Sequence, residues 1–89
     1  MTAPPKALVM PALPKHFALV LDPDDPQYEE FVTIWKPTDP VMWWGSQFDG
    51  HAVLYRVTGD GRLDTAHHRD AGRAEARWSR LYPLKLEWL

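Results

Sequence analysis

The strongest constraint on the fold is a β-hairpin signal between residues 51 and 68. Residues 51–57 (HAVLYRV) alternate, so that large apolar side chains gather on one face. The turn-forming residues 58–62 (TGDGR) follow, and a second β-prone run comes after them. We therefore expect the domain to be built around an antiparallel strand pair.

Two registers are open to this hairpin. A two-residue turn at Asp60-Gly61 would set Val57 against Asp64 and put the apolar positions of the two strands out of phase. The alternative is a three-residue loop over residues 59–61, with Gly61 in the left-handed region. It pairs apolar residues with each other and a basic residue with an acidic one. Its pairs are Val57 with Leu63, Arg56 with Asp64 and Tyr55 with Thr65. We predict this second register.

Three further runs are typical of strands. Residues 16–21 (HFALVL) are almost continuously apolar, which indicates a strand buried on both faces. Residues 41–48 (VMWWGSQF) form a second candidate, with Gly45 at a bulge or a close approach, and Asp49-Gly50 predicts a tight turn that joins them to residue 51. Residues 84–89 (LKLEWL) alternate and are expected to form a last strand, at an open edge of the sheet.

Two segments have apolar residues at helical spacing. In residues 26–36 a stripe of large side chains falls on one helix face, and Lys36-Pro37 would end the helix. The stripe consists of Tyr28, Phe31, Val32 and Trp35. We favour a helix. The alternative is a strand, because the same segment is rich in β-branched and aromatic residues. Residues 71–82 predict a second helix, capped by Asp70 and ended by Pro83.

Length and composition limit the chain to one small domain. Its 89 residues can bury one hydrophobic core, and 45% hydrophobic with 25% charged residues is typical of a globular protein. Residues 1–15 contain four prolines and are expected to form a proline-rich arm, which leaves residues 16–89 as the folded domain. The elements predict an α+β fold: a mostly antiparallel sheet of about five strands, with two amphipathic helices packed on one face.

The sequence also bears on location. It has no cysteine, which excludes disulfides, thiolate metal sites and cysteine nucleophiles. Pro11 interrupts the apolar residues 7–10 before they reach signal-peptide length, and no stretch approaches the ~20 apolar residues that cross a bilayer. We therefore expect a soluble cytoplasmic protein without a membrane partner.

Five tryptophans in so short a chain require an explanation. Trp35, Trp78 and Trp88 lie on apolar stripes and are expected in the core. Trp43 and Trp44 are neighbours on a predicted strand and cannot point the same way, so at least one is expected to meet solvent or another molecule. An exposed tryptophan could contact a protein partner or stack on a base or sugar. The alternative is that both are buried under the helices and the arm.

Histidines provide a second candidate site. In the preferred register His51 lies near His67 on one face of the hairpin, and His68 points to the other. Two imidazoles with Asp49 or Asp70 could bind zinc or nickel, or one imidazole could act as a general base. The spacing matches no known metal motif. We therefore favour solvent-exposed histidines at the end of the hairpin and expect no metal or cofactor.

Arg73, Arg77 and Arg80 recur at i, i+4 and i+7 on the second predicted helix. Such a basic stripe can hold phosphates or an acidic protein surface, and a solvated helix face explains it equally well. Residues 1–50 contain 3 Lys and 7 Asp or Glu (−4), whereas residues 51–89 contain 7 Lys or Arg and 5 acids (+2). This asymmetry can mean attraction between the two halves of one chain, which we favour, head-to-tail association of chains, or an anionic partner. Because the net charge is −2, nucleic acid is not expected to be the main partner.

No catalytic motif stands out. Ser46 and Ser79 lack a nucleophile-elbow sequence, and the glycines of residues 59–61 are too few to cradle a phosphate. We do not expect an enzyme, unless two of the histidines share a cleft. The leading hypothesis is a non-catalytic interaction module that binds a protein partner or a second copy of itself as a homodimer. The alternative is a small-ligand or nucleic-acid binding domain that uses an exposed tryptophan and the arginine stripe.

Overall fold

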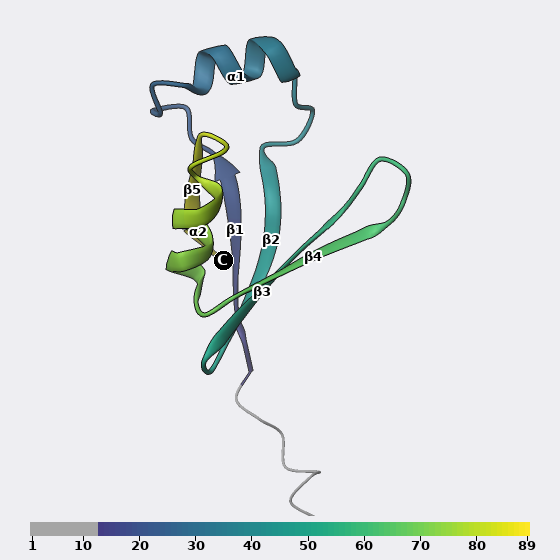
Figure 1. The fold of residues 1–89 in the computed structure, drawn as a ribbon, viewed down its shortest axis with the longest axis vertical. Helices are drawn as coiled ribbons and strands as arrows, with labels where there is room; N and C mark the ends of the chain where they lie inside the picture. Colours follow the sequence, from purple (N-terminus) through teal and green to yellow (C-terminus); the bar gives the residue numbers. More distant parts are fainter. Residues whose placement is uncertain (1–12) are drawn as a thin grey trace, which may run out of the picture.

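Five strands form one sheet in the order β4-β3-β2-β1-β5 in the computed structural model, which describes residues 13–89 (Figure 1). The strands are β1 (Lys15–Leu21), β2 (Val41–Phe48), β3 (His51–Val57), β4 (Leu63–His68) and β5 (Leu84–Trp88). Every neighbouring pair is antiparallel. The predicted α+β fold with a five-stranded antiparallel sheet and two helices is confirmed.

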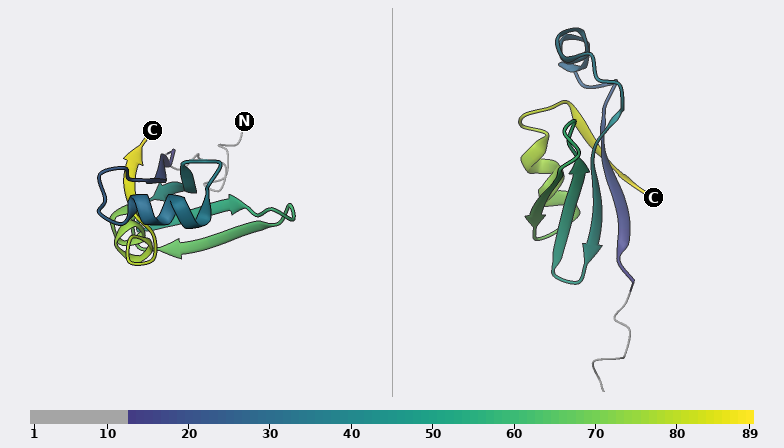
Figure 2. Two further views of the ribbon diagram at one scale, coloured as in Figure 1. Left: turned by 90° about the horizontal axis from the view of Figure 1, so that it is seen from above. Right: turned by 90° about the vertical axis from the view of Figure 1, so that its right-hand side faces the viewer.

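The two helices connect strands in different ways. Helix α1 (Tyr28–Trp35) joins β1 to β2 and lies beyond one end of the sheet. Helix α2 (Ala71–Trp78) joins β4 to β5, which are the two opposite edges, so this connection crosses the sheet. In Figure 2 (right) α2 lies against one side of the sheet, and no helix of the described residues covers the other side. The sheet therefore has one covered face and one open face.

The core fills the space between α2 and the covered face. Its buried side chains include Phe17, Leu19, Trp43, Leu54 and Ala74. Trp78 reaches down from α2 to Trp43, with 5.0 Å between ring centroids. The predicted strand over residues 16–21 is confirmed as an interior strand, because β1 lies between β2 and β5 and Phe17, Ala18 and Leu19 are all buried.

Gly45 makes room for the ring of Phe17. The two residues face each other across β1 and β2, and a Cβ atom at Gly45 would lie 2.3 Å from Cζ of Phe17. Such a distance is impossible without displacing the ring, so only glycine lets this aromatic side chain cover the neighbouring strand. The predicted close approach at Gly45 is confirmed. The irregularity of β2 lies elsewhere, at the register shift beside Leu19 and Val20.

The hairpin β3–β4 has the predicted three-residue register. Val57 pairs with Leu63, and Arg56 pairs with Asp64, whose carboxylate lies 3.5 Å from Nε of the arginine. Gly61 has a φ of +83°, the left-handed conformation that this loop requires. The Asp60 carboxylate accepts hydrogen bonds from the Thr58 hydroxyl and the Arg62 N–H, which lower the Asp60 pKa. This hairpin occupies one edge of the sheet.

Residues 28–35 form a helix, as predicted, and not the alternative strand. Tyr28, Phe31 and Val32 pack against the edge of the core, and Phe31 meets Tyr82 edge to face at 5.7 Å. The helix ends at Lys36, which has a φ of 47° and whose N–H donates to the Val32 carbonyl. Because α1 extends beyond the sheet, it has no fully buried residue.

The structure corrects two expectations about the tryptophans. Trp35 and Trp88, expected in the core, are 69% and 53% exposed. Trp35 is the last residue of α1, which lies beyond one end of the sheet, and its ring stacks on Phe31 at 6.3 Å. Trp88 is on the edge strand β5, where it contacts Phe17 edge-on at 5.5 Å but has no strand on its outer side. Each ring contacts one apolar neighbour, as its position in an apolar stripe predicts, but neither ring is buried.

The second helix is shorter than predicted. It ends at Trp78, and the residues up to 82 form a turn in which the N–H groups of Leu81 and Tyr82 both donate to the Trp78 carbonyl. Its predicted start is confirmed, since the Asp70 carboxylate accepts the N–H of Arg73 at 2.7 Å. Of the predicted proline-rich arm, residues 1–12 lie outside the described residues.

Candidate interaction face

The open face of the sheet is defined by strand alternation. Trp43, Leu54 and Ala66 face α2, so the alternate residues of β2, β3 and β4 point the other way. We call the side chains on that side of these three strands the open face. They are Trp44, Ser46 and Phe48 on β2, His51, Val53, Tyr55 and Val57 on β3, and Leu63, Thr65 and His67 on β4.

Large apolar side chains of the open face reach solvent. Trp44 is 41% exposed and Phe48 is 39% exposed, and Val57 and Leu63 at the hairpin tip are 71% and 64% exposed. Trp44 pairs directly with Tyr55 across β2 and β3. Aromatic and aliphatic groups therefore gather on one contiguous surface, an arrangement that marks interaction sites on small proteins.

The open face has no formal charge when its histidines are neutral. None of its residues, all of which the structure describes, is Asp, Glu, Lys or Arg. The charged pair Lys85 and Glu87 lies two strands away on β5, with 3.6 Å between its charged atoms. Arg56 points to the covered face, where its guanidinium lies 4.3 Å from the Trp43 ring centroid. The open face therefore consists of uncharged side chains, many of them aromatic or aliphatic.

A row of aromatic rings closes one end of the open face. Phe48 and His51, next to the tight turn, have ring centroids 5.3 Å apart and planes only 15° apart. His67 on β4 continues the row at 6.3 Å from His51, with 18° between planes. The predicted proximity of His51 and His67 is confirmed. His16 on β1 does not join them, because its Nδ1 is hydrogen-bonded to the Ser46 hydroxyl at 3.0 Å.

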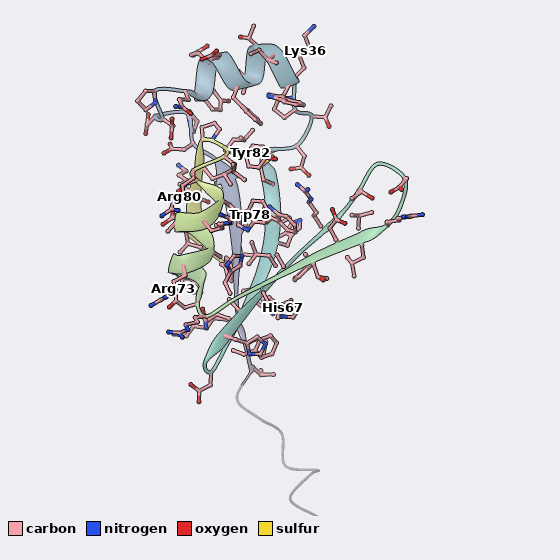
Figure 3. The ribbon with its side chains drawn as sticks, in the orientation of Figure 1. Lys36, His67, Arg73, Trp78, Arg80 and Tyr82 are labelled. Carbon is pink, nitrogen blue, oxygen red and sulfur yellow. The ribbon has the colours of Figure 1, made fainter. Side chains whose placement is uncertain are left out.

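The structure separates the other predicted site residues from this face. Trp43 is 3% exposed and belongs to the core, so Trp44 is the accessible member of the pair. Arg73 and Arg77 are on α2, and Arg80 lies in the turn after it. Figure 3 shows Arg73 and Arg80 extending from the α2 side of the molecule. The arginines and Trp44 thus lie on opposite sides of the sheet and cannot contact one small ligand together.

His68 is the histidine that contacts the core. Its Nε2 accepts the indole N–H of Trp78 at 3.2 Å, on the covered face. Burial lowers the pKa of His68, and the nearby charges of Arg77 and His67 lower it further. The neutral imidazole is the form that can accept this hydrogen bond. His68 therefore has a structural role that the sequence did not indicate.

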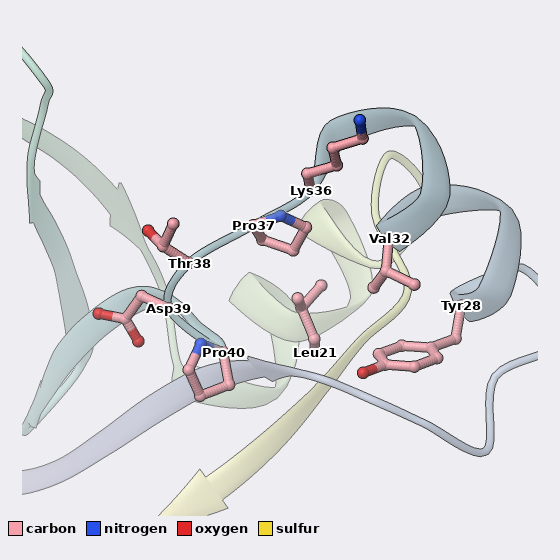
Figure 4. A pocket seen from close by; sticks show the side chains of 8 residues that line it. All are labelled: Leu21, Tyr28, Val32, Lys36, Pro37, Thr38, Asp39 and Pro40. Atoms are coloured by element: carbon pink, nitrogen blue, oxygen red, sulfur yellow. The ribbon is translucent and has the colours of Figure 1, made fainter.

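A hollow lies beneath α1, away from the open face (Figure 4). It has a volume of about 390 Å³, and its lining combines apolar residues with polar and charged ones: Leu21, Tyr28, Val32, Pro37 and Pro40 with Lys36, Thr38 and Asp39. Its one carboxylate, Asp39, already accepts the N–H of Val41 at 2.9 Å. In Figure 4 the side chains of Lys36, Thr38 and Asp39 extend away from Leu21, so they do not converge on the centre of the hollow as the polar groups of a ligand site do.

Within the described residues, no group of three or more His, Asp or Glu side chains could hold a metal ion. Residues 13–89 also contain no helix that is both long and apolar enough to cross a membrane.

The sequence had indicated only part of the open face. It drew attention to Trp44, His51 and His67 but not to Phe48, Tyr55 or Leu63. The alternation of residues 51–57 contained the missing signal, because it already placed Val53, Tyr55 and Val57 together. What alternation could not give is which of the two faces the helix covers.

No match was found when the chain was compared with protein-family models, with curated proteins and with solved structures.

Proposed function

We propose that this protein is a non-catalytic interaction module that associates with a second copy of itself through the open face of its sheet. The observation that supports this function best is the uncharged aromatic surface around Trp44, Tyr55 and Phe48. Burial of one large aromatic side chain removes roughly 150–250 Å² from water, so a few such residues can drive association. A second copy offers the matching surface without like-charge repulsion.

The arrangement of rows across the open face favours self-association. The middle row holds Ser46, Val53 and His67, and the bulkier Trp44 and Tyr55 lie in the row on one side of it. Phe48 and His51 pair in the row on the other side. A twofold axis along the middle row would therefore set Trp44 against Phe48 of the second copy, and Tyr55 against His51 of that copy. This arrangement would set aromatic rings against aromatic rings across the two packed sheets.

The size of the sheet indicates how strong the association would be. The three strands of the open face, about 4.8 Å apart and roughly 20 Å long, give a projected area on the order of 300 Å². Stable specific interfaces bury about 800 Å² on each partner. The open face is smaller than that. We therefore expect a dimer that forms at micromolar or higher concentrations and dissociates on dilution.

Nucleic acid fits the open face poorly. Proteins that stack bases on aromatic side chains also place Lys or Arg beside them to neutralise phosphates. The open face has no such residue, and Arg73, Arg77 and Arg80 lie on the α2 side. The same uncharged surface suits an apolar protein face.

Sedimentation velocity of the full chain over a dilution series, in EDTA, tests this function. The exchange Trp44→Ser removes the central ring of the open face and is expected to raise the dimer dissociation constant by roughly tenfold or more. Trp35→Ser is the matched control, because it removes an even more exposed tryptophan at the α1 end of the molecule. It should leave association unchanged. A wild-type chain that stays monomeric at high micromolar concentration would overturn the proposal.

A further inference from the structure

Every second residue of the edge strand β5 turns its backbone N–H and C=O away from β1. The Asp22 N–H donates to the Pro83 carbonyl at 2.8 Å, so residue 83 faces β1, and antiparallel pairing alternates from there along the strand. In the part of the chain that the structure describes, no strand pairs with the outer side of β5. The residues that face outward are Leu84, Leu86 and Trp88.

The Glu75 side chain of α2 occupies the centre of this outer edge. Its Oε2 accepts the outward N–H of Leu86 at 2.5 Å, and both residues are partly buried. A carboxylate is a stronger acceptor than a backbone carbonyl, so it competes well with any strand that approaches the edge. Natural sheets often protect their edges with charged side chains. Glu75 thus takes the backbone donor at the middle of the position that a sixth strand would fill.

The sequence of β5 is complementary to a second copy of β5. In an antiparallel pair centred on Leu86, the two Leu86 residues exchange both backbone hydrogen bonds, and Leu84 pairs with Trp88 of the second copy. The same register sets Lys85 directly opposite Glu87 of the second copy, and Glu87 opposite its Lys85. Trp88, which is 53% exposed, would gain a neighbouring strand. Backbone hydrogen bonding and side-chain charge therefore favour the same register.

We propose that the outer edge of β5 is a second self-association surface, which pairs with β5 of another copy and which Glu75 keeps closed. Pairing requires the Glu75 carboxylate to leave the Leu86 N–H in both copies. A twofold axis at Leu86 makes this contact self-complementary, so it would stop at two copies and join two five-stranded sheets into one. The β5 edge is separate from the open face, so this inference goes beyond the proposed function and does not depend on it.

Helix α2 has anchors other than Glu75, so a variant without this carboxylate is expected to fold. Ala71 and Ala74 are buried in the core. Trp78 packs on Trp43, with 5.0 Å between ring centroids. Replacement of Glu75 should therefore free the edge while α2 stays on the covered face.

Sedimentation velocity of the full chain carrying Trp44→Ser tests the β5 edge, because this exchange weakens association through the open face. In this background Glu75→Ala should lower the dimer dissociation constant by roughly tenfold or more, since pairing no longer breaks a hydrogen bond to a charged group in each copy. Glu75→Gln is the matched control. Its amide oxygen can still accept the Leu86 N–H, so its dissociation constant should stay close to that of the parent chain.

Charge exchange on β5 tests the register. In the chain with Trp44→Ser and Glu75→Ala, Lys85→Glu should weaken pairing, because two acidic side chains would then face each other across the interface. Addition of Glu87→Lys exchanges the two charges and should restore pairing. A loss of fold would not be rescued in this way, and circular dichroism of each variant checks that the fold is retained.

The outcomes separate this inference from the proposed function. A folded Glu75→Ala chain that associates no more strongly than its parent would overturn the closed edge, and so would a Glu75→Gln chain that associates as strongly as Glu75→Ala. Association that does not respond to the exchanges at Lys85 and Glu87 would overturn the pairing of β5 with β5. A wild-type chain that is monomeric, with a Glu75→Ala chain that is dimeric, would support the closed edge and contradict the proposed function.

Discussion

The indole N–H of Trp78 donates a hydrogen bond to Nε2 of His68 across 3.2 Å, and so ties α2 to the edge strand β4. The same tryptophan packs on Trp43 in the centre of the core. One side chain thus connects the helix both to the sheet interior and to its edge. These contacts hold α2 on the covered face and so stabilise the sheet. The opposite side of the same strands is the open face.

Acidification should destabilise the fold through His68. Its pKa is lowered in the folded protein, so between the folded value and the usual value near 6.5 the unfolded chain binds more protons than the folded one. The stability contributed by neutral His68 is therefore complete above that usual value and is lost as the pH falls below it. Urea unfolding at pH 7.5 and 5.5 should show a lower free energy of unfolding at pH 5.5.

The variant His68→Gln tests the origin of that loss. Its amide can still accept the Trp78 N–H but does not titrate, so the free energy of unfolding should fall less between the two pH values than in the wild type. Any residual slope in this variant arises from groups other than His68. An unchanged slope in His68→Gln would contradict the assignment.

Gly45→Ala should destabilise the protein by about 1–3 kcal/mol, because the new methyl group would overlap the Phe17 ring. Gly72→Ala is the matched exchange in α2, where the nearest atom is an Asp70 carboxylate oxygen at 3.4 Å. There alanine should stabilise the helix by up to ~1 kcal/mol. In thermal unfolding, Gly45→Ala should lower the melting temperature and Gly72→Ala should raise it. Equal changes in melting temperature would show that the Phe17 contact has no special importance.

Gly61→Ala should cost about 1 kcal/mol of folding free energy. Gly61 has a φ of +83°, where a Cβ atom is unfavourable, although nothing lies within 4 Å of the added atom. Gly59 in the same loop also faces open space but does not have a positive φ. Gly59→Ala should therefore be close to neutral in a urea titration. If both exchanges cost the same, the conformation of Gly61 is not the cause.

Trp43→Phe should be tolerated far better than Trp43→Ala. The Trp43 side chain is buried, and its indole N–H has no hydrogen-bond partner among the described residues. Phenylalanine removes that unpaired donor and keeps most of the ring, so we expect a loss below ~1.5 kcal/mol. Alanine leaves a cavity and should cost about 3–5 kcal/mol. Denaturant unfolding distinguishes the two, and similar losses would imply that the N–H has a partner.

Local patterns in the sequence were sufficient to predict the strands and the hairpin. The runs 41–48 and 51–57 have the same limits as β2 and β3, because alternation and turn residues act over a few positions. The pairing of Val57 with Leu63 could be predicted because it also sets Arg56 against the oppositely charged Asp64. These features depend on neighbours along the chain and are readable without the fold.

Burial of the tryptophans could not be predicted in the same way. Trp43 and Trp44 are identical residues at adjacent positions, and only the crossing of α2 over one face makes the first a core residue and the second a surface residue. Trp35 and Trp88 have the periodicity of core residues but lie where the sheet ends, at α1 and at an edge strand. Tertiary placement decides these cases, and with them the position of the open face.

The central claim is that two copies meet through their open faces, and an isotope-filtered NOE experiment on a mixture of labelled and unlabelled chains tests it most directly. At a concentration where the mass shows dimer, we predict intermolecular NOEs between the indole protons of Trp44 in one copy and the ring protons of Phe48 in the other. Intermolecular NOEs confined to Ile34, Trp35 and Leu81 at the α1 end, which are also exposed, would contradict the claim. So would a dimer without any NOE from the open face.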